Sequence, residues 1–594
     1  MRRLTLFGLA VLLFAGSIAS RQLKAAPTGL TQAQTPVAPA TAAAAAAAKD
    51  KDDEGTPITN AMVKKVCGEC HKSDEKGRMS RISYRRTTPE GWQETIRRMA
   101  TLNKVDMEPA EAREIVKYLA DNLGLAPEEV KPAAFEVERR LIDFKYPNAD
   151  AESVCASCHS IGRVMLQRRT TKEWDLLVAM HRSYYPLVDG QVFRRFGPPN
   201  STPGPDGRPP DNRHPMDKAL AHLKPTFPFT TPEWTSWSAT MRSPRIEGTW
   251  LLSGNEPGGG PIFGTVTIAA GASSDEFTTD MTYRYAMSGR TVARKGRVMI
   301  YTGHQWRGRS MVNGDDTTSL REVMAVERDW QTISGRWFTG SYDELGPDVT
   351  LTRIGREAVV AGLDRRAAKK GATTTVTIFG ANLPAATSAS LDFGRGVTVG
   401  RITGSSSTQI TAEISVASDA IVGARDLFVA GTLRKAALTI YDKIDYIKVA
   451  PGWSMARVGG NVFPKQLAQF DAVAWSNGPD GKPDTKDDLP IGPVDAAWSL
   501  EEYASTYGDD DVKFVGRIDE KIGLFTPSVD GPNPQRSGNR NNVGDVWVVA
   551  TYLPAGGGAP LRARAQLIVT VPLYQRWDFS TVGGPGRAGG GELR

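Results

Sequence analysis

The sequence predicts a multidomain protein in which a helical N-terminal domain is followed by three antiparallel β-sandwich or β-barrel domains. Its 594 residues are too many for one hydrophobic core. Apolar residues recur at helical spacing in the first part, whereas short runs rich in Val, Ile, Thr and Tyr alternate with Gly, Asn and Asp turns after Arg245. A hydrophobic content of 40% and a charged content of 23% are typical of a globular protein.

Residues 1–19 predict a secretory signal peptide. Arg2 and Arg3 precede an apolar run that ends in small residues, and the run is short of the ~20 residues that usually span a bilayer. Cleavage after export is therefore favoured over a retained membrane anchor, and no later segment is apolar enough to cross a membrane. We expect the mature chain to be periplasmic. Residues 20–55 are rich in Ala and Pro and predict a flexible leader.

Residues 56–242 form the predicted helical domain. Between Glu108 and Gly124, Ile115, Leu119 and Leu123 recur at helical spacing, and Gly124 provides a stop signal. Residues 197–232 are dense in Pro and Gly, so we expect them to be a loop that wraps around this domain.

The remaining chain divides into a β-barrel domain (243–355), an immunoglobulin-like β-sandwich (356–442) and a C-terminal β domain (443–594). Strand-forming runs are bounded by turn residues throughout, at spacings typical of sandwiches and barrels. The clearest runs cover residues 265–270, 297–303, 373–380, 408–417, 426–431, 545–553 and 565–571.

The net charge of +7 is modest and its basic residues are scattered, so nothing indicates binding to nucleic acid.

All four cysteines lie in two Cys-x-x-Cys-His motifs, with Cys67, Cys70 and His71 in the first and Cys155, Cys158 and His159 in the second. Two cysteines three positions apart can reach the two vinyl groups of one haem, and the next histidine can bind its iron. This is the attachment motif of c-type haem. Zinc bound by the two cysteine pairs is the alternative, but the pairs are far apart and each is followed at once by histidine. We therefore predict two covalent haems c and a helical di-haem cytochrome c domain.

An internal repeat follows the two motifs. Residues 85–99 (RRTTPEGWQETIRRM) and 168–181 (RRTTKEWDLLVAMH) share an Arg-Arg-Thr-Thr sequence and a following tryptophan. Each copy is expected to open a helix, with Thr88 and Thr171 as the N-caps and an acidic residue soon after.

The repeat indicates the sixth ligands of the two irons. Met99 stands seven residues after Trp92, and His181 stands seven residues after Trp174. A +7 residue returns to within about 20° of the same helix face. We therefore predict Met99 on the first iron, opposite His71, and His181 on the second, opposite His159.

Other side chains could take these places, and the alternatives are Met79, Met107, Met165, Met180, His214 and His222. His/Met ligation raises the reduction potential relative to His/His, so electrons are expected to flow from the second haem to the first. Two six-coordinate irons favour electron relay over chemistry at the metal.

Residues 477–488 (NGPDGKPDTKDD) carry several oxygen ligands in a Gly- and Pro-rich loop, from Asn477, Asp480, Asp484, Asp487 and Asp488. Such ligands suit Ca²⁺, although the spacing does not match an EF-hand. A solvated acidic turn is the commoner meaning of such a loop.

The chain resembles the α subunit of quinohaemoprotein amine dehydrogenase over most of its mature length. The resemblance is carried by CGECH and CASCH in an exported N-terminal domain, by the three β domains that follow, and by residues 523–552.

This resemblance implies a heterotrimer. A small partner subunit would carry a cysteine tryptophylquinone, and another partner would be a β-propeller. Electrons would pass from the quinone through one bis-His and one His/Met haem to a periplasmic copper protein or cytochrome c. The overall reaction would be oxidative deamination of a primary amine, with the quinone chemistry on the partner, because this chain has no cysteine left for such a cofactor.

Three other functions are compatible with the motifs alone. The chain could be a stand-alone di-haem cytochrome c that serves another dehydrogenase or a respiratory chain. It could also be a binding module whose β domains recognise a partner. A di-haem peroxidase would need one iron to open a coordination position.

Overall fold

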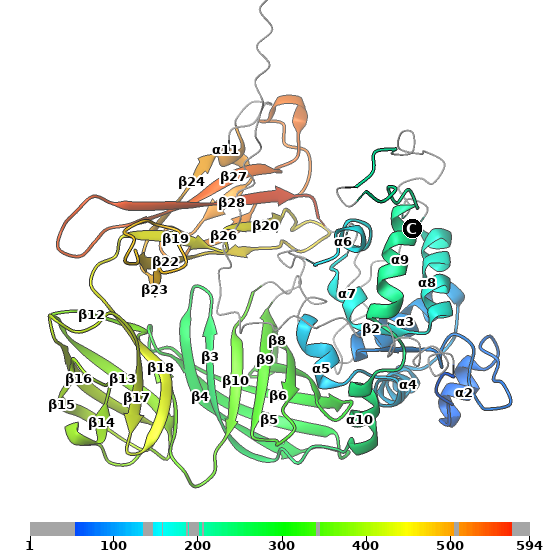
Figure 1. The fold of residues 1–594 in the computed structure, drawn as a ribbon, viewed down its shortest axis with the longest axis horizontal. Coiled ribbons are helices and arrows are strands. Elements are labelled where there is room, and N and C mark those ends of the chain that lie inside the picture. The colour runs from blue at the N-terminus through cyan, green and yellow to red at the C-terminus, as the bar shows by residue number, and fades with distance from the viewer. Residues whose placement is uncertain are drawn as a thin grey trace, which may run out of the picture.

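The computed structural model describes residues 54–134, 146–156, 159–185, 188, 201–204, 207–339, 345–503 and 510–572. The predicted signal peptide, nearly all of the predicted leader, and Cys158 lie outside these residues. Within them, the prediction of a helical N-terminal domain followed by several β domains is confirmed (Figure 1). No helix in the described part of the chain has the length and apolarity needed to cross a membrane.

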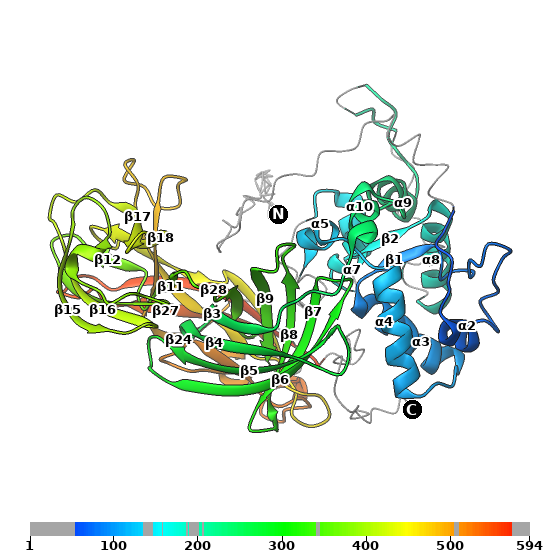
Figure 2. The same ribbon diagram turned by 90° about the horizontal axis from the view of Figure 1, so that it is seen from below.

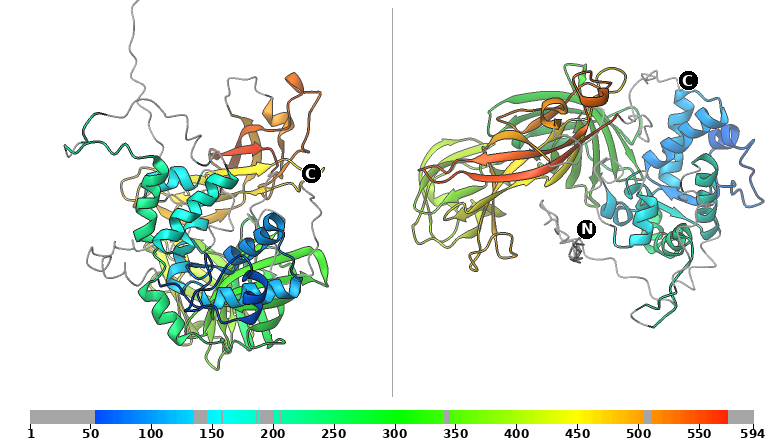
Figure 3. Two further views of the ribbon diagram at one scale, coloured as in Figure 1. Left: turned by 90° about the vertical axis from the view of Figure 1, so that its right-hand side faces the viewer. Right: turned by 90° about the horizontal axis from the view of Figure 1, so that it is seen from above.

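The helical domain has two halves. The first contains α2 (Ala61–Cys67), β1 (Arg85–Thr87), α3 (Pro89–Asn103) and α4 (Pro109–Asn122), followed by α5 (Pro127–Val130) and η1 (Lys131–Ala133). The second contains α6 (Ala149–Cys155), α7 (Gly162–Met165), β2 (Gln167–Arg169), α8 (Thr171–Tyr184) and α9 (Pro215–Thr226), and α10 (Pro232–Thr240) leads out of the domain. In the left view of Figure 3, α2–α4 and α6–α9 form two separate groups.

Each half has its own apolar core, as the amphipathic spacing predicts. Ile115 and Leu119 of α4 are buried with Trp92 in the first core, and Val178 of α8 is buried with Trp174 in the second. The helix expected over residues 108–124 is confirmed as α4.

Two local expectations were wrong. The N-cap of α8 is Thr170 rather than Thr171, because the Thr170 side chain accepts the N–H of Glu173. Residues 197–232 are not all loop, since α9 lies among them. Its buried face carries Met216, Leu220 and Leu223 at helical spacing, and this burial outweighs the surrounding Pro content.

The two halves are joined by a short antiparallel ribbon of β1 and β2, which lies among the helices (Figure 2). Its register pairs Arg85 with Arg169, Arg86 with Arg168, and Thr87 with Gln167. With Thr88 and Thr170 as equivalent N-caps, Arg86 and Arg168 become equivalent positions.

One carboxylate holds both central arginines. Arg86 is fully buried and donates to both oxygens of Glu129, at 2.8 and 2.9 Å. Arg168 approaches the same carboxylate with its Nε 3.0 Å from Oε1. Burial alone would raise the pKa of Glu129, but the charges of Arg86 and Arg168 and the hydrogen bonds to the carboxylate lower it to about 2. The two halves of the domain therefore share a buried Arg–Glu–Arg cluster.

The second domain is a closed antiparallel barrel with the strand order β10-β3-β4-β5-β6-β7-β8-β9. Alternation of buried and exposed residues, clearest along β5, fills the interior with apolar side chains that include Trp250, Trp306 and Trp337. Its strands are β3 (Gly248–Glu256), β4 (Gly260–Ala270), β5 (Glu276–Tyr285), β6 (Thr291–Tyr301), β7 (Gln305–Val312), β8 (Asp315–Val326), β9 (Thr332–Thr339) and β10 (Asp348–Arg353).

The barrel packs on the first half of the helical domain through the turn between β6 and β7. Thr302 donates its hydroxyl to the Ala120 carbonyl at 2.9 Å, and the buried His304 ring contacts the Leu125 carbonyl through Nε2 at 3.0 Å. Arg307 forms a buried ion pair with Glu90 of α3. These buried polar contacts fix the haem-motif domain against the barrel, and they give His304 a structural role.

The third domain is a β-sandwich of two four-stranded sheets with one shared core. One sheet contains β11 (Val359–Leu363), β13 (Thr373–Ala381), β16 (Gln409–Val416) and β15 (Val397–Ser405). The other contains β12 (Ala367–Lys369), β18 (Thr432–Tyr441), β17 (Gly423–Val429) and β14 (Leu391–Asp392), and η2 (Ser388–Ser390) precedes β14.

The C-terminal domain has three small sheets around another core. The first sheet contains β19 (Tyr446–Ala450), β22 (Asp471–Ser476) and β23 (Leu489–Val494). The second contains β20 (Trp453–Arg457), β28 (Leu561–Thr570), β27 (Gly544–Tyr552) and β24 (Ala497–Glu502). The third contains β21 (Ala468–Gln469), β26 (Leu524–Pro527) and β25 (Gly516–Ile518). α11 (Asp511–Phe514) and η3 (Ser537–Asn539) complete it. Strand pairing in the described β domains is antiparallel except for β12 with β18 and β20 with β28.

We expect Glu129→Gln to lower the free energy of unfolding of the helical domain by about 3–5 kcal/mol, because it leaves two buried guanidinium groups without a carboxylate. Glu128→Gln is the matched control, since the exposed Glu128–Arg328 pair should contribute less than about 1 kcal/mol. Denaturant titration of both variants measures the difference. Equal losses of unfolding free energy in the two variants would contradict the structural role assigned to Glu129.

The Glu129 carboxylate also makes the stability of the helical domain depend on pH. Its folded-state pKa of about 2 lies below the ~4.3 of an unfolded glutamate. Its contribution to stability is therefore complete above pH ~4.3 and is lost as the pH falls towards 2. Unfolding measured over this range should show a smaller acid-induced loss of stability in Glu129→Gln than in the unsubstituted chain.

Candidate haem sites

The first motif lies at the end of α2. Asn60 caps the start of this helix by accepting the Val63 N–H, and Cys67 is the last helical residue. The backbone N–H of His71 donates to the Cys67 carbonyl at 2.9 Å. This bond closes one further turn after the helix and keeps the two cysteines and the histidine close together. Cys67 packs against the first apolar core, whereas Cys70 is exposed. The pair can therefore bond a haem that lies between this core and the surface.

In the second motif, Cys155 ends α6 in the same way that Cys67 ends α2, and Asn148 caps that helix. Cys155 is partly buried against the second apolar core, and burial raises the pKa of its thiol to about 11. Cys158 is outside the described residues.

The three predicted histidine ligands share one hydrogen-bond arrangement. His71 contacts the Ser80 carbonyl through Nδ1 at 2.9 Å, His159 contacts its neighbour Ser160 in the same way at 2.9 Å, and His181 contacts Leu177 at 2.8 Å. A carbonyl can only accept, so Nδ1 carries the proton and Nε2 keeps a lone pair for a metal. The residues present therefore fit haem iron ligation at both motifs.

His159 and His181 lie close enough to interact electrostatically. Burial lowers the pKa of His159 to about 4, with the Ser160 carbonyl opposing this and the charges of Arg163 and His181 adding to it. Burial likewise lowers the pKa of His181. Burial thus lowers the pKa of both imidazoles, and a metal ion binds an imidazole in its neutral form. The role of His181 as the ligand opposite His159 stays a prediction.

The first iron has no second histidine among its predicted ligands. Met99 lies in the last turns of α3, partly buried, with its sulfur 3.6 Å from Nδ2 of Asn103. Met107 lies in the loop between α3 and α4, and its side chain packs on the same core as Cys67. Met79 is fully buried in that core. The prediction of Met99 therefore stays a prediction, with Met79 and Met107 as alternatives that belong to or pack on the same core as Cys67.

The alternatives for the second iron are placed differently. Met165 is buried in the second core, and Met180 is partly buried beside His181 in sequence. The Nε2 atom of His222 is 2.8 Å from the Tyr146 hydroxyl, and Nδ1 of His214 accepts the Met216 N–H as a helix cap. Both of these histidines are thus engaged within the protein.

The acidic loop brings together three of its carboxylates. Ligand oxygens of Asp480, Asp487 and Asp488 lie within 4.8 Å of one another. Asp484 instead pairs with Lys448, and Asn477 donates to the Gly481 carbonyl at 2.9 Å. Exposed acidic turns commonly take this form without a metal, so calcium stays a prediction.

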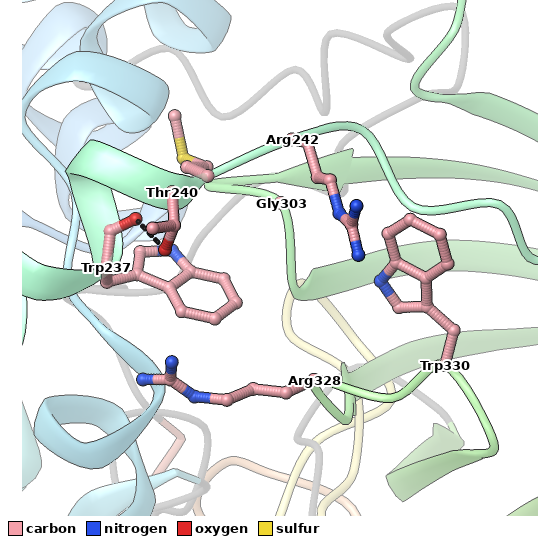
Figure 4. A pocket seen from close by; sticks show the side chains of 7 residues that line it. Trp237, Thr240, Arg242, Gly303, Arg328 and Trp330 are labelled. Carbon is pink, nitrogen blue, oxygen red and sulfur yellow. Dashed lines mark hydrogen bonds between the residues drawn. The ribbon is translucent and has the colours of Figure 1, made fainter.

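A pocket of about 250 Å³ lies at the junction of α10 and the barrel (Figure 4). Arg242 stacks on Trp330 with 4.4 Å from its guanidinium carbon to the ring centroid, and Arg328 stacks on Trp237 at 4.8 Å. Trp237 also donates its indole N–H to the Thr302 carbonyl at 2.9 Å. These side chains strengthen the interface between the helical domain and the barrel.

Sequence reasoning missed the arginines at the centre of the helical domain. Arg85, Arg86, Arg168 and Arg169 are all at least nine-tenths buried. The repeated Arg-Arg pair was the available indication, but such pairs are usually solvent-exposed. Only the pairing of β1 with β2 shows that both pairs are buried between the two halves.

Comparison with curated proteins gave no match. Among solved structures, a redesigned β-barrel is 15% identical, covering 20% of this chain and 98% of its own, with a TM-score of 0.17. A designed fluorescence-activating β-barrel is 16% identical, covering 18% of this chain and 93% of its own, with a TM-score of 0.15. A Bacteroides ovatus glucan-utilisation protein, SGBP-B, is 10% identical, covering 40% of this chain and 54% of its own, with a TM-score of 0.17.

Four family models match the chain in sequence. The model described as "Quinohemoprotein amine dehydrogenase A, alpha subunit, haem binding" matches residues 58–196. The models for alpha subunit domains II, III and IV match residues 243–354, 357–442 and 447–581. Together with the two haem motifs and the barrel and sandwich that follow them, these matches show that the chain belongs to the family of quinohaemoprotein amine dehydrogenase α subunits.

Proposed function

We propose that this chain relays electrons through two covalently bound haems c, from a cysteine tryptophylquinone on a small partner subunit to a soluble periplasmic acceptor. A copper protein or a cytochrome c would be the acceptor, and a β-propeller would be the third subunit of the complex. The family supports this proposal, because its members are subunits of an amine-oxidising enzyme and this subunit has the haem-binding domain. The signal-like first 19 residues support export to the periplasm.

The observation that carries the relay is the pairing of His159 with His181. Both rings keep Nε2 free, and they lie within electrostatic reach of each other. Two such imidazoles would suit the two ligand positions that one haem iron leaves open to a protein. When both positions are filled by protein, an iron can exchange electrons but has no vacant position for a substrate.

Each side chain then has a defined task. Cys67 and Cys70 attach the first haem and Cys155 and Cys158 the second, and a bound haem supplies one-electron redox chemistry. His71 and His159 bind the irons on one side, oriented by the Ser80 and Ser160 carbonyls. His181 and Met99 complete the two ligand sets. The unequal sets favour electron transfer from the second haem to the first.

The amine chemistry belongs to the partner in this proposal. Oxidation of a primary amine to an aldehyde and ammonia needs a carbonyl-type cofactor, and all four cysteines here are committed to haem. The barrel, sandwich and C-terminal domain exceed what a simple electron carrier needs, which supports a role in holding the complex together.

Expression of the tagged chain with its neighbouring genes tests the complex. We expect a heterotrimer in which a small subunit stains for quinone and in which added amine reduces the haems. Amine-dependent haem reduction should disappear when the small subunit's gene is deleted. A stable complex that contains no quinone would contradict the proposed donor and would favour a stand-alone di-haem cytochrome.

His181→Ala should convert the second haem from low spin to high spin, because it removes one axial ligand. Electron paramagnetic resonance and carbon monoxide binding measure the change, and added imidazole should restore the low-spin spectrum. Met180→Ala is the matched control on the same helix and should leave both haems low spin. A His181→Ala protein whose second haem stays low spin without imidazole would refute the ligand.

Met99→Ala should abolish the weak far-red charge-transfer absorption of methionine-ligated haem and lower the potential of the first haem. Met107→Ala is the paired variant and should keep both properties. The reverse result would move the ligand from α3 to the loop before α4. Retention of the band in both variants would exclude both methionines.

A further inference from the structure

The first Cys-x-x-Cys-His motif is followed by a turn with a strained backbone. Arg81 has a φ of +67°, a left-handed value that residues other than glycine rarely adopt. The Ile82 N–H donates to the Ser80 carbonyl at 2.8 Å, so one hydrogen bond closes a three-residue turn around Arg81. Turns of this size with a positive φ at the centre are rare and strained. Such strain persists only where surrounding contacts hold it, and it is commonly found at functional sites.

The Ser80 carbonyl of this turn contacts the predicted ligand of the first iron. It lies 2.9 Å from Nδ1 of His71 and therefore accepts from this ring as well as from Ile82. The Ser80 N–H donates to the Lys72 carbonyl at 3.0 Å, which closes the loop between the motif and the turn. A carbonyl that accepts from Nδ1–H fixes the orientation of a ligating ring and raises the basicity of its other nitrogen. The turn around Arg81 therefore fixes the acceptor of His71.

The second motif is built differently. His159 contacts the carbonyl of the next residue, Ser160, whereas His71 contacts a carbonyl nine residues further along the chain. The local backbone fixes a contact between sequence neighbours. A contact across nine residues depends on how the loop between them is held. The acceptor of the first histidine therefore needs support from other parts of the domain.

Two sets of contacts hold the turn. At its ends, the Met79 N–H donates to the Ser83 hydroxyl at 2.8 Å, and the Ser83 N–H donates to the Met79 carbonyl at 3.0 Å. At its tip, Nε of Arg81 forms an ion pair with Oε2 of Glu173 at 3.1 Å. Glu173 lies in the first turn of α8, its side chain is only 5% exposed, and it also lies 3.7 Å from Arg169. A buried carboxylate of the second half thus holds the strained residue of the first half, where salt screens the pair less than at the surface.

We propose that Arg81 and Glu173 are positioning residues for His71. Their ion pair holds the turn in which the Ser80 carbonyl accepts from the His71 ring, so the second half of the domain tunes the potential of the first haem. The inference rests on the proposed attachment of haem at the first motif. The hydrogen bond makes the ring a stronger electron donor to the iron, which stabilises the oxidised form and lowers the potential. Loss of the ion pair should therefore raise that potential.

Potentiometric titration of Arg81→Gln tests the proposal by the sign of the shift. Removal of a positive charge near a haem lowers its potential, whereas a weaker hydrogen bond to the His71 ring raises it. We expect the reduction equilibrium of the first haem to move about fivefold towards the reduced form, equal to about 41 mV for one electron. The far-red absorption of the methionine-ligated haem reports this potential. Hydrogen exchange of the Ile82 N–H, followed by mass spectrometry of its peptide, should become about tenfold faster.

Three further variants separate positioning from charge. Arg81→Lys keeps the charge and the partner, so it should change the equilibrium less than about twofold. Arg78→Gln is the matched control, because it removes the same charge from the same loop but Arg78 pairs with Asp74, at 2.6 Å. It should leave the potential unchanged or lower it. In a Glu173→Gln background, Arg81→Gln should raise the potential no further, because the ion pair is already lost.

A lowered or unchanged potential in Arg81→Gln, or unchanged exchange of the Ile82 N–H, would overturn the proposal. So would an equal rise of the potential in Arg78→Gln. Failure of the proposed function would be seen in the unsubstituted chain instead, as a first motif whose Cys67 and Cys70 carry no haem. If that chain has haem there but no far-red band, the proposed methionine ligand is refuted, and the exchange of the Ile82 N–H decides the role of Arg81.

Discussion

The buried cluster of Arg86, Glu129 and Arg168 holds the haem domain together. One carboxylate satisfies an arginine from each half of an internal repeat, at the centre of the ribbon that joins the halves. The placement of the arginine side chains on the two faces of the ribbon depends on this register. A slip of one residue in β1 would turn Arg85 towards Glu129 and would turn Arg86 towards α3 and α8.

The same register separates two electrostatic environments within a few residues. On one face of the ribbon, Glu129 binds Arg86 and Arg168, and Thr231 also accepts from Arg86. On the other face, Arg85 donates to Thr95 and Gly91 of α3, and Arg169 contacts Gln167 and Glu173. The two halves of the repeat are therefore similar in sequence, but the two faces of the ribbon between them differ in their charged contacts.

Much of the architecture could be predicted because its determinants are local. Amphipathic spacing predicted α4, and alternating β-branched runs predicted strands in the barrel, the sandwich and the C-terminal domain. The failures have local causes too. Thr170 and Thr171 are adjacent candidates for one cap, and their choice depends on how β2 ends. The loop expected over residues 197–232 contains α9, because burial of Met216, Leu220 and Leu223 against the second core outweighs a Pro-rich composition.

The sequence by itself predicted the chemistry of haem attachment, since a Cys-x-x-Cys-His motif needs only one helical turn to present its thiols and imidazole. It also determined that a helical domain precedes the β domains, because the spacing of apolar residues differs between helices and strands and is visible in the sequence. The tertiary structure alone decided that Met107 lies on the same core as Cys67 and that four arginines are buried between the halves. These are contacts between segments far apart in sequence, and their partners are chosen by strand register and helix packing rather than by neighbouring residues.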